Sequence, residues 1–116
     1  MPAHEKLNYV EYPTRNLPAT KTFFQAAFGW RFTDYGPEYA AFADEGLDGG
    51  FFSAEISARS DNGSALIVFN SAELEDTRAK VEAAGGEIVK PIFSFPGGRR
   101  FHFVEPGGNE FGVWSH

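Results

Sequence analysis

Four ionisable side chains in this 116-residue chain are candidates for a functional site, and two of them, His102 and Glu11, could perform acid–base chemistry. His102 is the one histidine that lies away from both ends of the chain. An imidazole moves protons readily near neutral pH, and a carboxylate such as Glu11 is a common counterpart. If the fold brings them together, His102 and Glu11 form a general acid–base pair. The other candidates, Arg100 and Glu110, also have structural interpretations, since Arg100 can form an ion pair with Glu11 and Glu110 can be solvated.

Composition narrows the classes of partner. The net charge of −6 disfavours nucleic acid and tolerates or attracts a cationic ligand. Cysteine is absent, which removes disulfides, thiolate nucleophiles and cysteine-based zinc sites. No apolar stretch approaches the roughly 20 residues of a membrane span, and residues 1–10 lack a signal-like apolar region. We therefore expect a cytoplasmic protein that binds neither membrane nor nucleic acid.

The chain contains an internal repeat. Residues 16–29 align without gaps on residues 73–86 at a constant offset of 57 (74 − 17). Both segments carry an apolar stripe at helical spacing and end in glycine, which favours a left-handed helix terminus. Asn16 is a candidate N-cap, and Pro18 is tolerated in the first turn. The identical pairs are Leu17/Leu74, Thr20/Thr77, Ala26/Ala83, Ala27/Ala84 and Gly29/Gly86.

Strand-like runs flank both predicted helices, so that each half has the order β-α-β-β-β. We predict an α+β fold in which two such modules, residues 5–57 and 64–116, form a curled sheet around a cleft within a single domain. Residues 58–63 are the linker. A ferredoxin-like domain is the alternative, but its β-α-β-β-α-β order lacks the extra strands. The predicted strands are residues 6–14, 31–34, 38–43, 50–54, 64–70, 87–91, 99–104 and 110–115.

Strand alternation predicts which side chains face the cleft. Tyr9 and Glu11 share one face of the first strand, while Tyr12 and Thr14 point at the helix. In the same way, Arg100 and His102 face the cleft, and Phe101 and Phe103 face the core. An apolar pocket with a few convergent polar groups is the usual form of a small-molecule site. The predicted ligand-binding residues are Tyr9, Tyr39, Phe51, Leu66, Asn70, Arg100, Glu110 and Trp114.

Three segments resemble signatures of one family in the expected order. These are Tyr9–Leu17 at the first strand and helix, Phe24–Trp30 at the helix end, and Phe103–Trp114 at the closing hairpin. The chain resembles the glyoxalase/bleomycin-resistance/dioxygenase superfamily, also called the vicinal oxygen chelate (VOC) superfamily, over nearly its whole length. The resemblance implies paired β-α-β-β-β modules, a divalent metal in the cleft of many members, and frequent homodimers.

The metal ligands of that family do not carry over to this chain. The first-strand histidine position is Tyr9, and its repeat in the second module is Leu66. Gly112 replaces the closing glutamate, and Phe51 is the expected equivalent in the first module. None of these side chains is a good ligand for a divalent metal. We therefore predict no metal cofactor.

Three functions follow as hypotheses. The first is a metal-free binding protein for an aromatic or cationic small molecule, as in bleomycin-resistance relatives. The second is a metal-independent lyase or isomerase of a small carbonyl compound that uses His102 and Glu11. The third is a divergent metal enzyme that uses His102, Glu11 and Glu110. The expected partners are a small-molecule ligand and a second copy of the chain, and the sequence leaves open whether residues 91–100 form a lid.

Overall fold

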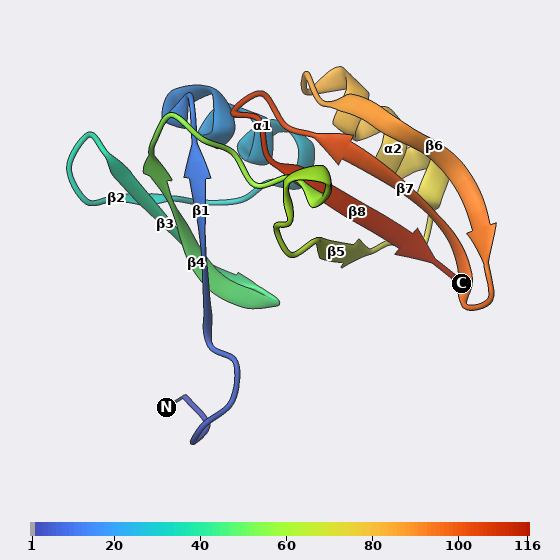
Figure 1. Ribbon diagram of the computed structural model, residues 1–116, viewed down its shortest axis with the longest axis horizontal. Helices are drawn as coiled ribbons and strands as arrows, with labels where there is room; N and C mark the ends of the chain where they lie inside the picture. The colour runs from blue at the N-terminus through green and yellow to red at the C-terminus, as the bar shows by residue number, and fades with distance from the viewer. Residues whose placement is uncertain (1) are drawn as a thin grey trace.

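Each half of the chain folds into one helix and four strands in the predicted order (Figure 1). The computed structural model describes residues 2–116. A short 3-10 turn, Ser60–Asn62, lies in the linker. The first module comprises β1 (Tyr9–Thr14), α1 (Leu17–Phe28), β2 (Thr33–Asp34), β3 (Tyr39–Glu45) and β4 (Leu47–Ser53). The second comprises β5 (Ile67–Asn70), α2 (Leu74–Ala83), β6 (Glu87–Phe95), β7 (Gly98–Val104) and β8 (Glu110–Ser115).

The two modules have the same sheet topology. The strand orders are β1-β4-β3-β2 and β5-β8-β7-β6, and in each sheet the first strand runs parallel to the last strand of its module. Within residues 2–116 no ladder joins the sheets, which lie side by side and unclosed (Figure 1). This architecture confirms the predicted α+β fold class. Among the described residues, no helix is both long enough and apolar enough to cross a membrane.

A repeated hydrogen bond confirms the offset of 57. The hydroxyls of Thr14 and Thr20 lie 2.7 Å apart, and those of Ser71 and Thr77 also lie 2.7 Å apart. In both modules the hydroxyl at the strand end accepts a backbone N–H two residues later, at 3.1 and 3.0 Å. The duplication therefore extends beyond the pattern of apolar residues to the polar joint between strand and helix.

The helix ends follow the sequence closely. The Asn16 side chain accepts the backbone N–H of Ala19, and Pro18 lies in the first turn of α1. Gly29 ends α1 with a φ of 69°, in the left-handed region. In the second module it is Gly85, with a φ of 101°, that turns the chain after α2.

One aromatic core spans both modules on the helix side of the sheets. Phe24 of α1 stacks on Trp30 at 4.4 Å between ring centroids, and contacts Phe51 and Phe111 at 5.5 and 5.4 Å. Phe51 belongs to the first sheet and Phe111 to the second, so α1 covers the junction between the modules. Most of the abundant phenylalanine fills this core, as burial of large apolar area requires.

The turn at residues 105–109 fastens the second module to the first. The buried Glu105 carboxylate accepts the Thr20 hydroxyl at 2.8 Å and the Asn109 amide at 2.8 Å. The same amide donates to the Pro13 carbonyl at 2.7 Å, and the Asn109 side-chain oxygen accepts the Ala58 N–H at 2.7 Å. Burial raises the pKa of Glu105 despite these hydrogen bonds. This joint between the two modules explains the turn without any ligand.

The strand predicted for residues 87–91 was too short, because β6 continues to Phe95. Phe93 pairs with Arg100, and Phe95 pairs with Gly98, across a tight hairpin. Pro91 falls within the register shift between Lys90 and Phe93 on the edge strand of its sheet, where its missing N–H breaks no essential pairing. Residues 91–100 are therefore part of the sheet and not a separate lid.

Candidate functional site

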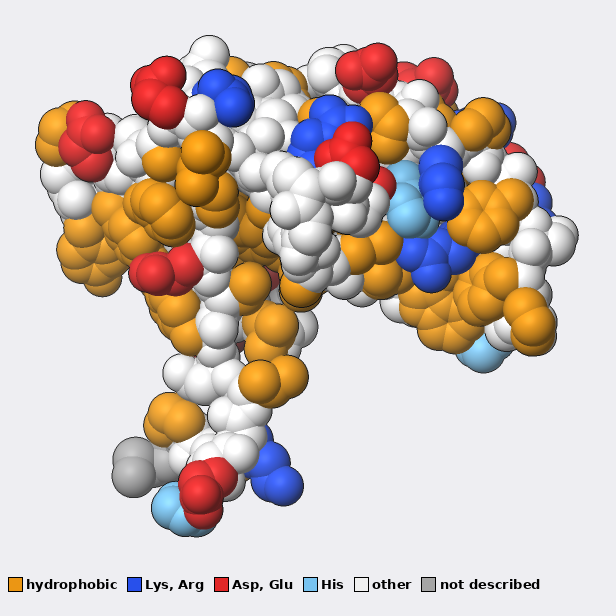
Figure 2. All heavy atoms as spheres, in the orientation of Figure 1, with side chains coloured by type: hydrophobic (Ala, Val, Ile, Leu, Met, Phe, Trp, Pro, Cys, Tyr) orange, Lys and Arg blue, Asp and Glu red, His pale blue; other side chains and the backbone are white. Residues whose placement is uncertain are grey.

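The sheets present two open faces on the side opposite the helices. In β1, Tyr12 and Thr14 are buried toward α1, whereas Tyr9 and Glu11 are exposed on the other side. We call the face carrying Tyr9, Glu11 and Tyr39 the first open face. The second open face carries Arg100 and His102, and Figure 2 shows basic and histidine side chains beside hydrophobic ones over this module.

A hydrogen-bonded chain organises the first open face. The Tyr39 hydroxyl donates to Glu11 Oε2 at 2.8 Å. It lies 2.5 Å from the Tyr9 hydroxyl, which must therefore be the donor to Tyr39. Burial, followed by the hydrogen bonds with Tyr9 and Glu11, raises the pKa of Tyr39 above its ordinary range. Tyr39 therefore stays protonated and holds the Glu11 carboxylate in place.

Gly50 makes this chain possible. Gly50 pairs with Glu11 on one side and with Ala41 on the other, so Tyr39 reaches Glu11 diagonally across it. A Cβ at residue 50 would lie 2.8 Å from Cε2 of the Tyr39 ring and closer still to its outer atoms. A glycine inside a strand often marks such a close approach. The Gly49–Gly50 pair was thus a signal in the sequence for this site.

On the second open face, the His102 ring lies between the carboxylate of Glu110 and the guanidinium of Arg100. Its Nδ1 is 2.9 Å from Glu110 Oε2, and its Nε2 is 2.8 Å from Arg100 Nη2. A guanidinium only donates, so Nε2 must be the acceptor and the ring proton resides on Nδ1. His102 is therefore neutral in this arrangement, with Nδ1–H donating to Glu110.

Glu110 is buried, and both of its carboxylate oxygens accept hydrogen bonds. Its Oε1 accepts both the backbone N–H and the hydroxyl of Ser60, each at 2.8 Å. Burial alone would raise the pKa of Glu110, but the hydrogen bonds from His102 and Ser60 outweigh it and lower that pKa. Glu110 is therefore a fixed anion. Ser60 of the linker was not among the predicted site residues, and nothing in its polar surroundings distinguished it.

The structure does not pair Glu11 with His102. Glu11 lies in the first sheet with Tyr39, and His102 lies in the second sheet with Glu110 and Arg100. Arg100 likewise makes its contacts with His102 and not with Glu11. The predicted polar group therefore divides between the two modules of a single chain.

The placement of Phe51 in the cleft was wrong. Phe51 is fully buried in the core, 5.1 Å from the Tyr12 ring and on the helix side of its sheet. Ladder registers show why: Glu11 pairs with Gly50, and its repeat Val68 pairs with Gly112. Gly50 is therefore the true equivalent of Gly112, and a slip of one residue transfers a side chain to the opposite face.

The remaining predicted residues, Leu66, Asn70 and Trp114, lie outside the two polar clusters. Leu66 precedes β5 and is half-buried, near the position that a Cβ on Gly112 would occupy. Asn70 is exposed at the end of β5. Trp114 is half-buried beside Phe95, at 6.3 Å between ring centroids.

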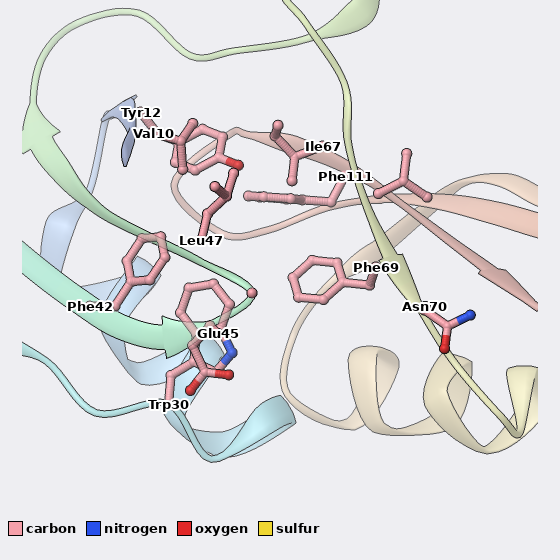
Figure 3. Close-up of a pocket in the computed structure, with 12 residues that line it drawn as sticks. Val10, Tyr12, Trp30, Phe42, Glu45, Leu47, Ile67, Phe69, Asn70 and Phe111 are labelled. Carbon is pink, nitrogen blue, oxygen red and sulfur yellow. The ribbon is translucent and has the colours of Figure 1, made fainter. Parts of the chain in front are cut away.

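A pocket of about 370 Å³ opens at the seam between the modules, away from both polar clusters. Figure 3 shows aromatic side chains of both modules around it, with Asn70 at its edge. Trp30 and Phe42 form one wall, with ring centroids 4.4 Å apart. This apolar space was not predicted. Its lining is Val10, Tyr12, Trp30, Phe42, Glu45, Gly46, Leu47, Ile67, Val68, Phe69, Asn70 and Phe111.

The residues at the family's ligand positions do not fit a divalent metal. Tyr9 is engaged with Tyr39, Leu66 is apolar, and both Gly112 and its equivalent Gly50 lack a side chain. Across residues 2–116, no three His, Cys, Asp or Glu side chains gather closely enough to hold a metal ion. The set His102, Glu11 and Glu110 is therefore not assembled within one chain.

Comparison with known proteins supports the architecture. The structure matches a glyoxalase/bleomycin resistance protein/dioxygenase family enzyme from Burkholderia phytofirmans PsJN, with a TM-score of 0.78 and 19% identity, over 95% of this chain and 98% of that one. It also matches a glyoxalase-related enzyme from Fulvimarina pelagi, with a TM-score of 0.76 and 18% identity, over 97% and 88% of the two chains. TioX from Micromonospora sp. ML1 gives a TM-score of 0.73 and 16% identity, over 96% and 98%.

At these identities the structural matches establish the fold alone. No curated protein sequence matches the chain. The family model described as the Glyoxalase/Bleomycin resistance protein/Dioxygenase superfamily matches residues 6–113, which is nearly the entire sequence. The chain therefore belongs to the glyoxalase/bleomycin resistance protein/dioxygenase superfamily.

Proposed function

We propose that this chain is a small-molecule-binding protein whose ligand is an aromatic compound with a positive charge, bound on the first open face. The observation that carries the proposal is the chain Tyr9–Tyr39–Glu11, with its 2.5 and 2.8 Å hydrogen bonds. It presents a fixed carboxylate at the end of a pair of hydrogen-bonded tyrosines, on an open face of the sheet. Such a site is prepared for a cation before the ligand arrives.

Charge supports this class of ligand. No ion pair within residues 2–116 includes Glu11, so its negative charge is stabilised only by the neutral Tyr39. A ligand cation over the tyrosine rings gains about 0.5–1 kcal/mol from each exposed cation–π contact. The net charge of −6 also favours the approach of a cation.

We further propose that the protein is a homodimer in which the second copy packs against exposed apolar residues beside the open faces. Leu7, just before β1, is 91% exposed, and Val68 is exposed as well. The two open faces are not enclosed by the chain's own helices, which lie on the opposite side. Sedimentation velocity tests the assembly: a dimer is expected, and a monomer at high concentration would contradict it.

Ligand class is tested by titrating the ¹⁵N-labelled protein with benzyltrimethylammonium and with neutral benzyl alcohol. Saturable binding of the cation is expected, with shifts in β1 and β3. E11Q should weaken it at least tenfold, and Y39F should weaken it less because the carboxylate remains. E55Q, in the exposed stretch after β4, is the matched control. Equal binding of the cation by E11Q and the unmodified protein would refute the proposal.

A metal-independent lyase or isomerase is the second candidate, favoured by the Glu110–His102 pair. A carboxylate on Nδ1–H fixes the tautomer and leaves Nε2 with the lone pair, as a general base requires. Arg100 covers Nε2 and would have to swing aside for a substrate. Deuterium exchange into small hydroxyketones, measured by NMR in the presence of EDTA, tests this activity. Exchange that persists in H102Q would rule out His102 as the base.

A further inference from the structure

Arg100 carries a positive charge that no carboxylate neutralises within the described chain. None of the ion pairs in residues 2–116 includes it. Its one hydrogen-bonding partner there is the Nε2 of His102, contacted by Nε at 3.2 Å and Nη2 at 2.8 Å. The tautomer argued above makes His102 neutral, so the guanidinium charge remains available. Glu110, the nearby acid, is occupied by Nδ1 of His102 and by Ser60.

The Arg100 guanidinium also has N–H groups that make no hydrogen bond to the described side chains. Two of its five N–H groups point at His102, which leaves three without an acceptor among the described side chains. These three include both N–H groups on Nη1. A planar fork with free parallel donors is the geometry that recognises a carboxylate or phosphate through two hydrogen bonds.

Neighbouring aromatic rings hold this guanidinium in place. Its central carbon lies 5.8 Å from the ring centroids of both Phe93 and Phe95. Nη2 lies 3.3 Å from the position that a Cβ on Gly112 would take, so the side chain extends across that glycine. Arg100 occupies the same ladder position in its sheet as Tyr39 does in the first, two residues before the partner of the glycine. Each module thus lays one long polar side chain over a glycine.

The rest of this surface is suited to an apolar body attached to the anion. Phe93, Arg100 and Trp114 are direct neighbours across three strands, and Phe93 is 37% exposed. Lys90 pairs with His102 in the ladder, and its Nζ lies 5.6 Å from the Phe93 ring centroid. A second cation therefore stands beside the same ring.

We propose that the second open face is a binding site for a single oxyanion, carboxylate or phosphate, carried by an aromatic small molecule. Arg100 binds the oxyanion through its free donors, Lys90 adds charge, and the rings of Phe93, Phe95 and Trp114 contact the aromatic body. His102 stays bonded to the guanidinium and, through Glu110, fixes its orientation. The site does not depend on the first open face.

The test uses four probes on the ¹⁵N-labelled protein: phenyl phosphate, benzoate, inorganic phosphate and neutral benzyl alcohol. Phenyl phosphate and benzoate should bind saturably and shift the Arg100 Nε–Hε resonance. R100Q should weaken both at least tenfold, and R100K, which keeps the charge but loses the fork, should weaken them less. R31Q removes an exposed arginine outside this face and is the matched control.

Each alternative outcome counts against a stated part of the proposal. Equal affinity for benzyl alcohol and benzoate would overturn the oxyanion site, as would undiminished binding by folded R100Q. F93A should weaken phenyl phosphate several-fold and leave inorganic phosphate unchanged. Equal affinity for inorganic phosphate and phenyl phosphate would overturn the role of the rings. The benzyltrimethylammonium titration reports on the first open face, so either proposal can fail alone.

Discussion

Replacing Gly50 with alanine should break the hydrogen-bonded chain Tyr9–Tyr39–Glu11 on the first open face while leaving the fold intact. The added Cβ would overlap the outer part of the Tyr39 ring, with 2.8 Å to Cε2 and less to Cζ and the hydroxyl. Those atoms are the outer end of a half-buried side chain on an open face of the sheet, so Tyr39 can swing away. Gly50 has no positive φ, and alanine is therefore compatible with its backbone.

The magnitude follows from two opposing terms. Displacing Tyr39 removes its hydrogen bonds to Glu11 and Tyr9, each with a net value of about 0.5–1.5 kcal/mol. Replacing glycine by alanine at a compatible position stabilises the folded state by about 0.4–1 kcal/mol, because it lowers the conformational entropy of the unfolded chain. The free energy of unfolding of G50A should therefore fall by about 0–2.6 kcal/mol, depending on where each term lies in its range.

G49A provides the contrast one residue away. Its Cβ would lie 2.6 Å from the buried Phe42 ring and closer to the backbone oxygen of Val10, which cannot swing aside. Overpacking of this kind costs about 1–3 kcal/mol or more. Urea unfolding should therefore find G49A less stable than G50A, because the clash at residue 49 involves backbone and a buried ring.

Alkaline titration of tyrosinate absorbance reports on the displaced ring. Tyr39 resists ionisation because burial and its hydrogen bonds raise its pKa. G50A should gain a titration step at about pH 10, the ordinary tyrosine value, and G50A/Y39F should lack it. An unchanged titration in G50A, or destabilisation as large as that of G49A, would show that Tyr39 does not depend on Gly50.

Three further predictions concern stability. Asn109→Ala should lower the free energy of unfolding by about 2–4 kcal/mol, since it leaves buried backbone partners unpaired; urea denaturation that finds no loss would exclude the proposed joint between modules. The pKa of Glu110 is lowered in the folded state, so its contribution is present above the unfolded pKa and is lost as pH falls through the folded pKa. E110Q should therefore show a flatter stability profile below about pH 4.5 than the unmodified protein, and parallel profiles would contradict this sign. Phe51→Ala should cost about 3–5 kcal/mol, and the half-buried Phe52→Ala much less; similar thermal unfolding of the two would place Phe51 outside the core.

The repeat made most of the fold predictable. The offset of 57 aligned Thr20 with Thr77, and the structure extends the same offset to Thr14 and Ser71, whose side chains make the matching hydrogen bonds. Helix ends followed from local chemistry, because Asn16 and Gly29 satisfy backbone groups in the way their residue types favour. Strand alternation correctly placed Glu11 and Tyr12 on opposite faces of β1. It also separated His102, which contacts Glu110, from the core residue Phe103.

The site was less predictable because β4 gives no alternating pattern. Its central residues are two glycines followed by two phenylalanines, so hydrophobicity does not identify which phenylalanine faces the core. Only the pairing of Gly50 with Glu11 fixes the register. In the same way, Pro91 suggested the end of a strand, and the sequence could not show that β6 is an edge strand where proline is tolerated. The separation of Glu11 from His102 depends on the packing between modules, which no local pattern encodes.

The joint formed by Glu105 and Asn109 also constrains how the protein can be made. Glu105 lies 85 residues after Thr20 and Asn109 lies 96 residues after Pro13, so these bonds link the last part of the chain to the first helix. Ribosomes release the N-terminal half first, and domains complete their contacts as units. The first helix therefore emerges long before the residues that secure it, and the aromatic core stays open to chaperones until translation is nearly finished.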